Sequence, residues 1–195
     1  AVLGASTPIR DAWERRPLQL QLLDDAYLPE RAAANVKKLL AQDDVLALLS
    51  CFGTPTNQAL LPLVQEAGIP YVAPVSGALS LRKGQRNVFH VRASYSDEIV
   101  RLVQRLTEMG LKNIAIVYQD NSYGQEMLAD ASRALQAQGQ QPALQASVAT
   151  DGKNLAAIVT QVAAARPAAV LLATAGTVSV GLVRGLRKSA AGVLL

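Results

Sequence analysis

The sequence predicts a doubly wound α/β protein, in which helices cover a mainly parallel sheet. Short runs rich in Val, Ile and Leu alternate with segments of helical period along the 195-residue chain, which is the pattern of βαβ units. Half of the residues are hydrophobic but only 4% are aromatic, so Ala, Leu and Val must build the interior. That composition suits helices packed on parallel strands. The alternation falls in two blocks, divided near the polar residues 92–97.

The first block is predicted to contain five strands and two helices. Pro29 begins the first helix, because its missing amide hydrogen is harmless in a first turn, and Val36, Leu39 and Leu40 continue its apolar face. The second helix ends at Gly68, a residue typical of a helix C-terminus. The strands are predicted at residues 1–5, 18–23, 45–50, 71–73 and 88–91, and the helices at residues 29–40 and 56–67.

The second block is predicted to alternate strictly between helix and strand. Its first helix carries an apolar stripe that includes Ile99, Val103 and Leu106, and it ends at Gly110. The helices are predicted at residues 96–109, 124–138, 154–165 and 178–188, and the strands at residues 113–118, 143–148 and 169–174. Residues 193–195 have the composition of the beginning of another strand.

The spacing near the beginning of the chain is too short for the predicted topology. About a dozen residues, including Pro8 and Pro17, separate the first two predicted strands, whereas a parallel crossover needs a helix of ten or more residues. A strand also begins at the last residues. We therefore expect this sequence to omit stretches of a longer chain.

Composition excludes several classes of protein. The chain has 19 Lys and Arg against 15 Asp and Glu, a net charge of +4, but the basic residues are scattered and form no cluster with aromatic residues, so we expect no nucleic-acid surface. Cys51 is the single cysteine, which excludes an internal disulfide and a cysteine-rich metal site; we expect it to be a small buried hydrophobe. No apolar run approaches the length of a membrane span.

The residues of an enzyme are largely missing. The sequence contains no glycine-rich phosphate loop, no zinc-protease motif and no serine-hydrolase motif. His90 is the only histidine, and it lies on an apolar run, where a structural role is the simpler interpretation. Asp24 and Asp25 follow the second predicted strand and could act on a substrate, although such residues more often end a strand and remain solvated. We expect no catalytic residue, no cofactor and no metal.

Two loops at strand ends are better candidates for a binding site. Residues 51–57 (CFGTPTN) follow one predicted strand, and residues 74–78 (PVSGA) follow the next. The hydroxyls of Thr54, Thr56 and Ser76, together with free amides at a helix N-terminus, could bind a carboxylate. The alternative is that Thr54 or Thr56 only caps the helix that begins there.

The second block offers two further loops. Tyr123 lies in a strand-to-helix turn, where it could close over a ligand with its ring and hydroxyl, although ordinary turn packing is the alternative. Thr174 begins another loop of small residues at a strand end.

Taken in order, these segments resemble one known family. The segments are residues 24–40 (DDAYLPERAAANVKKLL), 52–57 (FGTPTN), 68–78 (GIPYVAPVSGA), 89–98 (FHVRASYSDE) and 114–125 (IAIVYQDNSYGQ). They resemble the periplasmic leucine/isoleucine/valine-binding proteins, the type I solute-binding proteins of ABC importers. The resemblance implies two Rossmann-like lobes, residues 1–93 and 94–195, joined by a hinge whose first crossing is residues 92–94.

The resemblance also implies which residues bind the ligand, in a cleft between the lobes. Thr54 matches the hydroxyl residue that takes the ligand carboxylate, helped by the helix end near Thr56. The other implied contacts are Phe52 in the side-chain pocket, Val75, Ser76 and Gly77 at the carboxylate and ammonium groups, and Tyr123, Thr174 and Ala175 on the second lobe. The acidic residue that neutralises the ligand ammonium in such proteins has no match here, and the family's small disulfide lacks its second cysteine.

The function implied by the resemblance is solute uptake. We expect a monomeric periplasmic protein that closes on a small carboxylate-bearing solute, a branched-chain or other aliphatic amino acid, and presents it to an ABC permease. One alternative is a sensory or regulatory module that binds amides, amino acids or aromatic acids. The other is a hydrolase or reductase that acts through Asp24 or Asp25.

Overall fold

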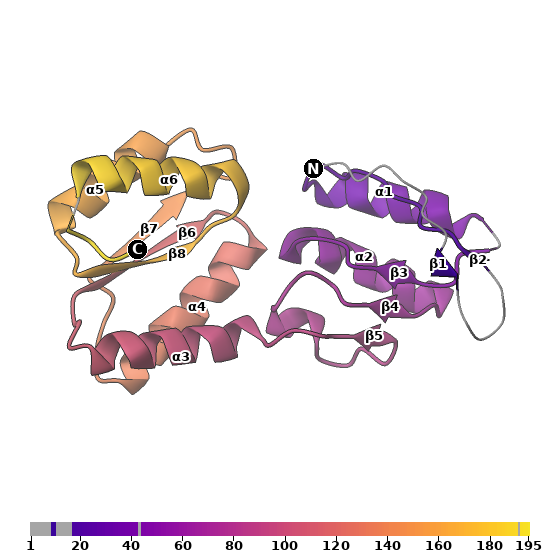
Figure 1. The fold of residues 1–195 in the computed structure, drawn as a ribbon, viewed down its shortest axis with the longest axis horizontal. Helices are drawn as coiled ribbons and strands as arrows, with labels where there is room; N and C mark the ends of the chain where they lie inside the picture. The colour runs from indigo at the N-terminus through magenta and orange to yellow at the C-terminus, as the bar shows by residue number, and fades with distance from the viewer. Residues whose placement is uncertain (1–8, 11–16, 43, 191) are drawn as a thin grey trace.

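The chain folds into two lobes that each contain a parallel three-stranded sheet (Figure 1). The computed structural model describes residues 9–10, 17–42, 44–190 and 192–195. We call the elements up to β5 (Val88–Phe89) the first lobe and those from α3 (Tyr95–Glu108) onward the second lobe. The chain passes from one to the other between β5 and α3 (Figure 1). The predicted α/β class with parallel sheets is confirmed.

The first lobe has its helices on one face of its sheet. Its elements are α1 (Pro29–Leu40), β3 (Leu48–Leu49), α2 (Thr54–Ala67), β4 (Tyr71–Val72), the 3₁₀ helix η1 (Leu79–Leu81) and β5, in the strand order β3-β4-β5. Leu48, Tyr71 and Val88 pack with both helices in one core cluster. Neighbouring side chains point to the opposite face, where Leu49 is 55% and Phe89 is 53% exposed.

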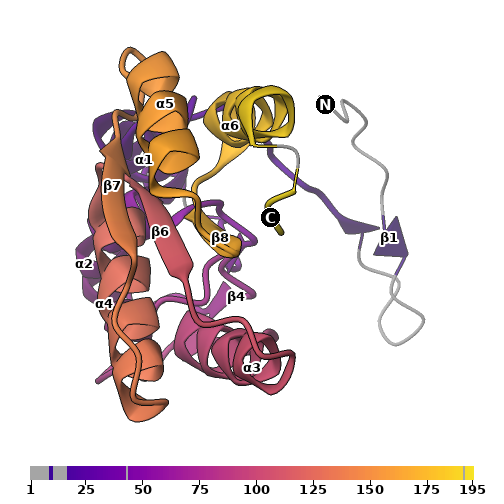
Figure 2. The ribbon, with the colours of Figure 1, turned by 90° about the vertical axis from the view of Figure 1, so that its left-hand side faces the viewer.

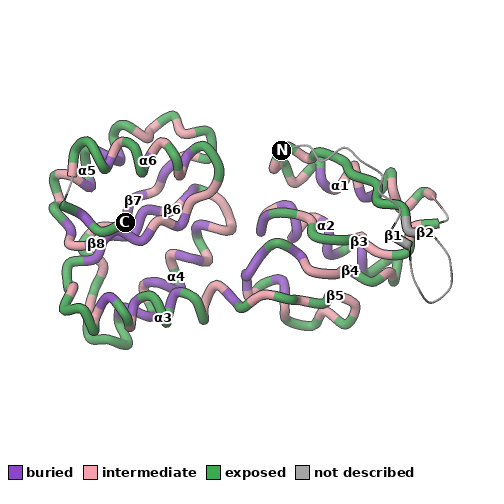
Figure 3. Tube along the Cα trace, viewed as in Figure 1, coloured by how far each residue is buried: buried purple, intermediate pink, exposed green. Residues whose placement is uncertain are grey.

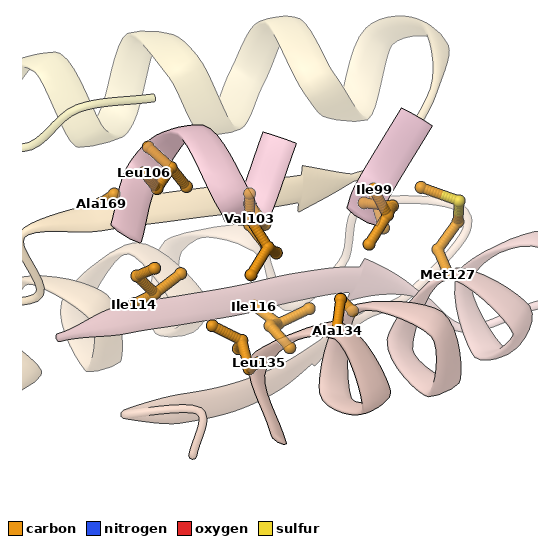
Figure 4. Packing of buried hydrophobic residues seen from close by; sticks show 12 residues of the cluster. Ile99, Val103, Leu106, Ile114, Ile116, Met127, Ala134, Leu135 and Ala169 are labelled. Atoms are coloured by element: carbon orange, nitrogen blue, oxygen red, sulfur yellow. The ribbon is translucent and has the colours of Figure 1, made fainter. Parts of the chain in front are cut away.

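The second lobe is covered on both faces of its sheet. Its elements are α3, β6 (Ile114–Gln119), α4 (Ser122–Ala137), β7 (Leu144–Val148), α5 (Leu155–Ala165), β8 (Ala169–Ala173) and α6 (Gly176–Ser189), in the strand order β7-β6-β8. Ile114 and Ile116 pack against α3 and α4 (Figure 4). Ala115 and Val117 point the other way, toward α5 and α6, so the strands lie between two helix pairs (Figure 2).

The helices lie close to their predicted positions. The first is α1 as predicted, and each of the other α-helices begins and ends within two residues of its predicted bounds, whereas the 3₁₀ helix η1 was not predicted. Pro29 occupies the first turn of α1, and Gly68 ends α2. The strands of the second lobe match almost as well, whereas those of the first lobe contain only two residues each.

One predicted strand is wrong. Only Leu18 of residues 18–23 is in a strand: β2 (Pro17–Leu18) pairs antiparallel with β1 (Ile9–Arg10), and the rest has no strand structure. Leu20 is 54% and Leu22 is 64% exposed. An apolar run becomes a strand only where a neighbouring strand completes its hydrogen bonds, and the described residues provide no such neighbour here. The predicted strand at residues 1–5 lies outside the described residues.

The end of the chain lies beside β8, as predicted for a further strand. Leu194 forms a parallel bridge with Ala169, and its carbonyl accepts from the amide of Val170 at 2.8 Å. The pairing is a single bridge rather than a full strand. No helix in the described part of the chain is both long and apolar enough to cross a membrane.

Candidate ligand-binding site between the lobes

The two loops singled out in the first lobe lie side by side. Phe52 forms a parallel bridge with Val75. The amide of Val75 donates to the carbonyl of Cys51 at 2.9 Å, and the amide of Gly53 donates to the carbonyl of Val75 at 3.2 Å. The pairing of β3 with β4 therefore continues beyond both strands and fixes the two loops against each other.

Thr54 and Ser76 meet through their hydroxyls. The two oxygens are 2.8 Å apart, and the residues are 1% and 0% exposed. The hydroxyl of Ser76 also accepts from the amide of Ala78 at 3.2 Å. In such a pair one hydroxyl donates to the other, so one hydroxyl hydrogen stays available for an acceptor. A ligand that reaches this pair must move the side chains that cover it.

Thr56 has a structural role in the same loop. Its buried hydroxyl donates to the carbonyls of Phe52 and Gly53, at 3.0 Å for Gly53. The helix begins at Thr54 with Gly53 as its N-cap, and no side chain caps it, so neither threonine caps the helix. The hydroxyl hydrogen of Thr56 is already used by the backbone. Its amide still belongs to the first turn of α2, where amides lack helical partners.

An aromatic pair lies beside these hydroxyls. Phe52 is 53% and Val75 is 37% exposed, so both leave apolar surface uncovered. The ring of Tyr27 lies 5.6 Å from that of Phe52, centroid to centroid. Tyr27 also lies against Gly53: a Cβ at Gly53, where φ is +95°, would come within 2.2 Å of the Tyr27 ring. A side chain at Gly53 is therefore excluded both by its backbone and by Tyr27.

Tyr123 approaches the first lobe from the first turn of α4. Its ring makes an edge contact with Tyr95, with centroids 5.3 Å apart, and the amide of Tyr95 donates to the carbonyl of Gly77 at 2.8 Å. Burial raises the pKa of Tyr123 to about 12, with smaller contributions from the phenols of Tyr95 and Tyr27. The Tyr123 hydroxyl is therefore a neutral hydrogen-bond donor at ordinary pH.

Tyr27 of the first lobe and Asn121 of the second lie near each other. Burial raises the pKa of Tyr27, Tyr95 raises it further, and the side chain of Asn121 opposes the rise. Asn121 is the N-cap of α4, and its side-chain oxygen accepts from the amide of Gly124 at 3.0 Å. The same residue thus fixes the start of α4 and lies beside the phenol of the opposite lobe.

The remaining predicted residues, Thr174 and Ala175, lie at the end of β8. The Thr174 hydroxyl is 2.7 Å from that of Ser179, and the amide of Ala175 donates to the side-chain oxygen of Gln119 at 3.2 Å. These polar contacts all lie within the second lobe. The structure therefore joins Phe52 to Val75 and Thr54 to Ser76, but it does not join Thr174 and Ala175 to them.

The candidates for chemistry occupy structural positions. Asp24 and Asp25 accept from the amides two residues ahead, at 2.9 and 2.8 Å, as turn residues do. The Nε2 of His90 is 3.2 Å from the carbonyl oxygen of Leu81, and burial lowers the pKa of His90. Burial raises the pKa of the partly buried Cys51 thiol. The described residues hold no group of acidic, histidine and cysteine side chains able to bind a metal.

Sequence reasoning missed Tyr27, Tyr95 and Asn121. Tyr27 stands in the turn after Asp25 with a positive φ of 62°, an unusual conformation that the sequence does not reveal. Tyr95 directly follows the predicted crossing at residues 92–94, and this position is the signal that could have placed it near the boundary between the lobes. Asn121 could have been identified as an N-cap from its residue type.

The chain matches a family model and many solved structures. The model is that of the periplasmic binding proteins, and it matches residues 11–193. A substrate-binding periplasmic protein from Ralstonia solanacearum is similar with a TM-score of 0.82 and 29% identity, over 88% of this chain and 48% of that chain. A possible leucine/isoleucine/valine-binding protein from Rhodopirellula baltica is similar with a TM-score of 0.75 and 26% identity, over 85% and 47%.

A more distant structure shows the same fold. It is the solute-binding protein of an ABC transporter from Rhodopseudomonas palustris in complex with 3,4-dihydroxybenzoic acid, with a TM-score of 0.82 and 17% identity, over 91% of this chain and 50% of that chain. The chain thus spans about half the length of the solved structures that it matches. No curated protein matches it.

Proposed function

The chain belongs to the periplasmic binding protein family, in its type I leucine/isoleucine/valine-binding branch, and on this premise we propose that it holds a small carboxylate-bearing solute between its lobes. This family consists of solute-binding proteins rather than enzymes. We further propose that the protein is a periplasmic monomer, that the lobes divide at residues 93 and 94, and that an ABC permease receives the solute.

The single observation that carries the proposal is the buried hydroxyl pair of Thr54 and Ser76, 2.8 Å apart, at the first turn of α2. The amides of Thr54 and Thr56 add donors there, because the first turn of a helix has no carbonyls one turn back to receive them. Such a set of neutral donors favours an anion. From the second lobe, Tyr123 lies near Tyr27 of the first lobe. We propose that Thr174 and Ala175, which are also on the second lobe, reach the solute when the lobes close.

The nature of the solute beyond its carboxylate is a finer proposal. The aliphatic amino acid that we expected from the sequence is supported by the similarity to the possible leucine/isoleucine/valine-binding protein. The exposed surfaces of Phe52 and Val75 would serve the apolar part of such a ligand. A benzoate is bound by one protein of the same fold, so aromatic acids belong in the test.

Isothermal titration calorimetry tests both the binding of a carboxylate and the class of the solute. The panel contains L-leucine, L-isoleucine, L-valine, benzoate and 3,4-dihydroxybenzoate. We expect one class of acid to bind, and its carboxamide to bind at least about tenfold more weakly, because the neutral amide loses the charge-assisted hydrogen bonds. Absence of heat and of a thermal shift with every acid, or equal binding of acid and amide, contradicts the proposal.

A matched pair of variants tests the hydroxyls. Thr54→Val with Ser76→Ala should weaken binding of the acid about tenfold or more, since the hydroxyl hydrogen that the pair can offer to the ligand is lost. Thr160→Val is the control, because its hydroxyl lies on the exposed side of α5, bonded to the carbonyl of Ala156 at 3.1 Å. The control should bind the acid like the parent protein.

A further inference from the structure

The carboxylate of Glu126 reaches from the second lobe to the first. Glu126 lies on α4 one turn after Tyr123. Its Oε1 accepts from the backbone amides of Leu79 and Ser80, at 3.4 Å for Ser80, and its Oε2 accepts from the hydroxyl of Ser80 at 2.8 Å. Both partners belong to η1 of the first lobe. One side chain thus receives three hydrogen bonds across the boundary between the lobes.

The two ends of this contact are anchored next to the candidate site. On the first lobe, η1 begins three residues after Ser76, and the side chain of Gln58 on α2 donates to the hydroxyl of Ser80 at 3.1 Å. On the second lobe, α4 carries Tyr123. A change in the Glu126 contact therefore changes the distance between the loop of Ser76 and the helix of Tyr123.

The charge of Glu126 is not needed by its own helix. Arg133 pairs with Asp130 rather than with Glu126. The pKa of Asp130 is raised mainly by burial, and Glu126 raises it further by repulsion. The favourable partners of the Glu126 carboxylate thus lie on the opposite lobe, where amide and hydroxyl donors make charge-assisted hydrogen bonds.

We propose that Glu126 is a positioning residue that latches the lobes together and thereby sets the affinity for the solute. The Glu126 contact stabilises the arrangement in which the helix that carries Tyr123 lies against η1, the segment that follows Ser76. Other contacts between the lobes lie at or beside the crossing, where Arg82 donates to the carbonyls of Arg92 and Ala93 at 2.9 and 3.1 Å and the amide of Tyr95 donates to the carbonyl of Gly77 at 2.8 Å. The inference rests on the proposed function only in taking lobe closure as the binding step.

The latch is tested first without any solute. Lys38 on α1 and Arg184 on α6 are each replaced by cysteine in a Cys51→Ala background and carry a spin label. Pulsed electron paramagnetic resonance then measures the distance between the two labels, and so between the lobes. We expect Glu126→Gln to broaden this distance distribution and move it to longer values, because the neutral amide loses the charge-assisted bonds. Ser80→Ala, which removes one of the three donors, should give a smaller shift in the same direction.

The control is Glu108→Gln, the same substitution at the exposed end of α3, where the carboxylate pairs with Arg105 of its own helix. It should leave the distance distribution unchanged. Thermal unfolding of each variant confirms that it is folded. An unchanged distribution in both Glu126→Gln and Ser80→Ala overturns the latch.

The second measurement uses whichever acid of the calorimetric panel binds. Glu126→Gln should weaken its binding about tenfold, mainly through faster release, whereas Glu108→Gln should not. Unchanged or tighter binding overturns the latch and leaves the proposed function intact. If no acid of the panel binds but Glu126→Gln opens the lobes, the proposed function fails and the latch stands.

Discussion

Three hydroxyl residues of one site show how a single residue type takes different roles. Thr54 and Ser76 bond to each other, whereas Thr56 bonds to backbone carbonyls one turn back. Thr56 therefore stabilises the start of α2, and the other two remain candidates for a ligand. Residue type and spacing could not separate these roles, because each hydroxyl can rotate to a local or a distant partner.

The phenol of Tyr123 gives a prediction about alkaline pH. Its pKa is about 12 in the folded protein and about 10 in an unfolded chain. Between these values the unfolded state has released a proton that the folded state retains, so rising pH favours unfolding. The stabilisation is complete below about pH 10 and is lost as the pH approaches 12. We expect the free energy of unfolding to fall across this window, and to fall less in Tyr123→Phe.

The tyrosinate absorbance of the folded protein provides the direct measurement. Tyr123→Phe should remove one component that titrates near pH 12. The same titration in denaturant is the control, since all tyrosines there should titrate near pH 10. If the variant instead loses a component near pH 10, the phenol is not buried and the prediction is wrong.

At the scale of elements, α4 organises most of the second-lobe side of the site. Asn121 caps it, its first turn carries Tyr123, and its second turn carries Glu126. The first turn of this helix lies very close to the backbone at the end of β6. A Cβ at Gly124 would lie 1.9 Å from the carbonyl oxygen of Gln119, and glycine alone leaves room for that approach.

Gly124→Ala tests this close approach. We expect it to lower the free energy of unfolding by about 2 kcal/mol or more, because the clash is with backbone that cannot rotate away. Chemical denaturation followed by circular dichroism measures the change. The control is Gly192→Ala, where a Cβ would meet nothing within 4 Å, and its effect should stay within about 0.5 kcal/mol. Equal effects of the two substitutions would contradict the proposed role of Gly124.

The elements of the chain were not equally predictable. All the α-helices agreed with their sequence pattern, because their hydrogen bonds join residues four apart and their caps are local. The strand predicted at residues 18–23 was wrong beyond Leu18, because the described residues give the rest of this apolar run no neighbouring strand. The strands of the first lobe are shorter than predicted for a related reason. The length of a strand depends on its pairing with distant segments, which the local pattern does not specify.

At the scale of the molecule, the two lobes differ in how well they are covered. The second lobe buries both faces of its sheet, in two separate core clusters, and β6 is buried at every residue except Tyr118, which is partly exposed (Figure 3). In the part of the chain that the structure describes, the first lobe buries one face, and Leu49 and Phe89 remain exposed on the other. Apolar burial is the main source of stability.

Hydrogen exchange should therefore differ between the lobes. The amides of Ile116 and Val117 in β6 should exchange at least about tenfold more slowly than those of Tyr71 in β4 and Ala73 directly after it. The comparison is matched, because the amides of Tyr71 and Ala73 are also hydrogen bonded, each at 2.8 Å. Mass spectrometry with peptide resolution measures the difference. Equal protection of the two sheets would show that the uncovered face does not weaken the first lobe.

The sequence by itself determined the α/β class, the helix positions and the loops that follow the strands. These features depend on periodicity, on Pro29 and Gly68 at helix ends, and on the rule that parallel strands place their following loops at one edge. The family resemblance added an ordered set of site residues, of which Phe52 and Val75 and Thr54 and Ser76 do lie together in pairs.

The tertiary structure alone decided how these parts meet. It placed Tyr27 against Gly53, Tyr95 beside Tyr123 and Glu126 on η1. Each of these contacts joins segments far apart in the chain. Local patterns cannot specify such pairs, because the free energy of a contact between distant residues depends on the whole fold that brings them together.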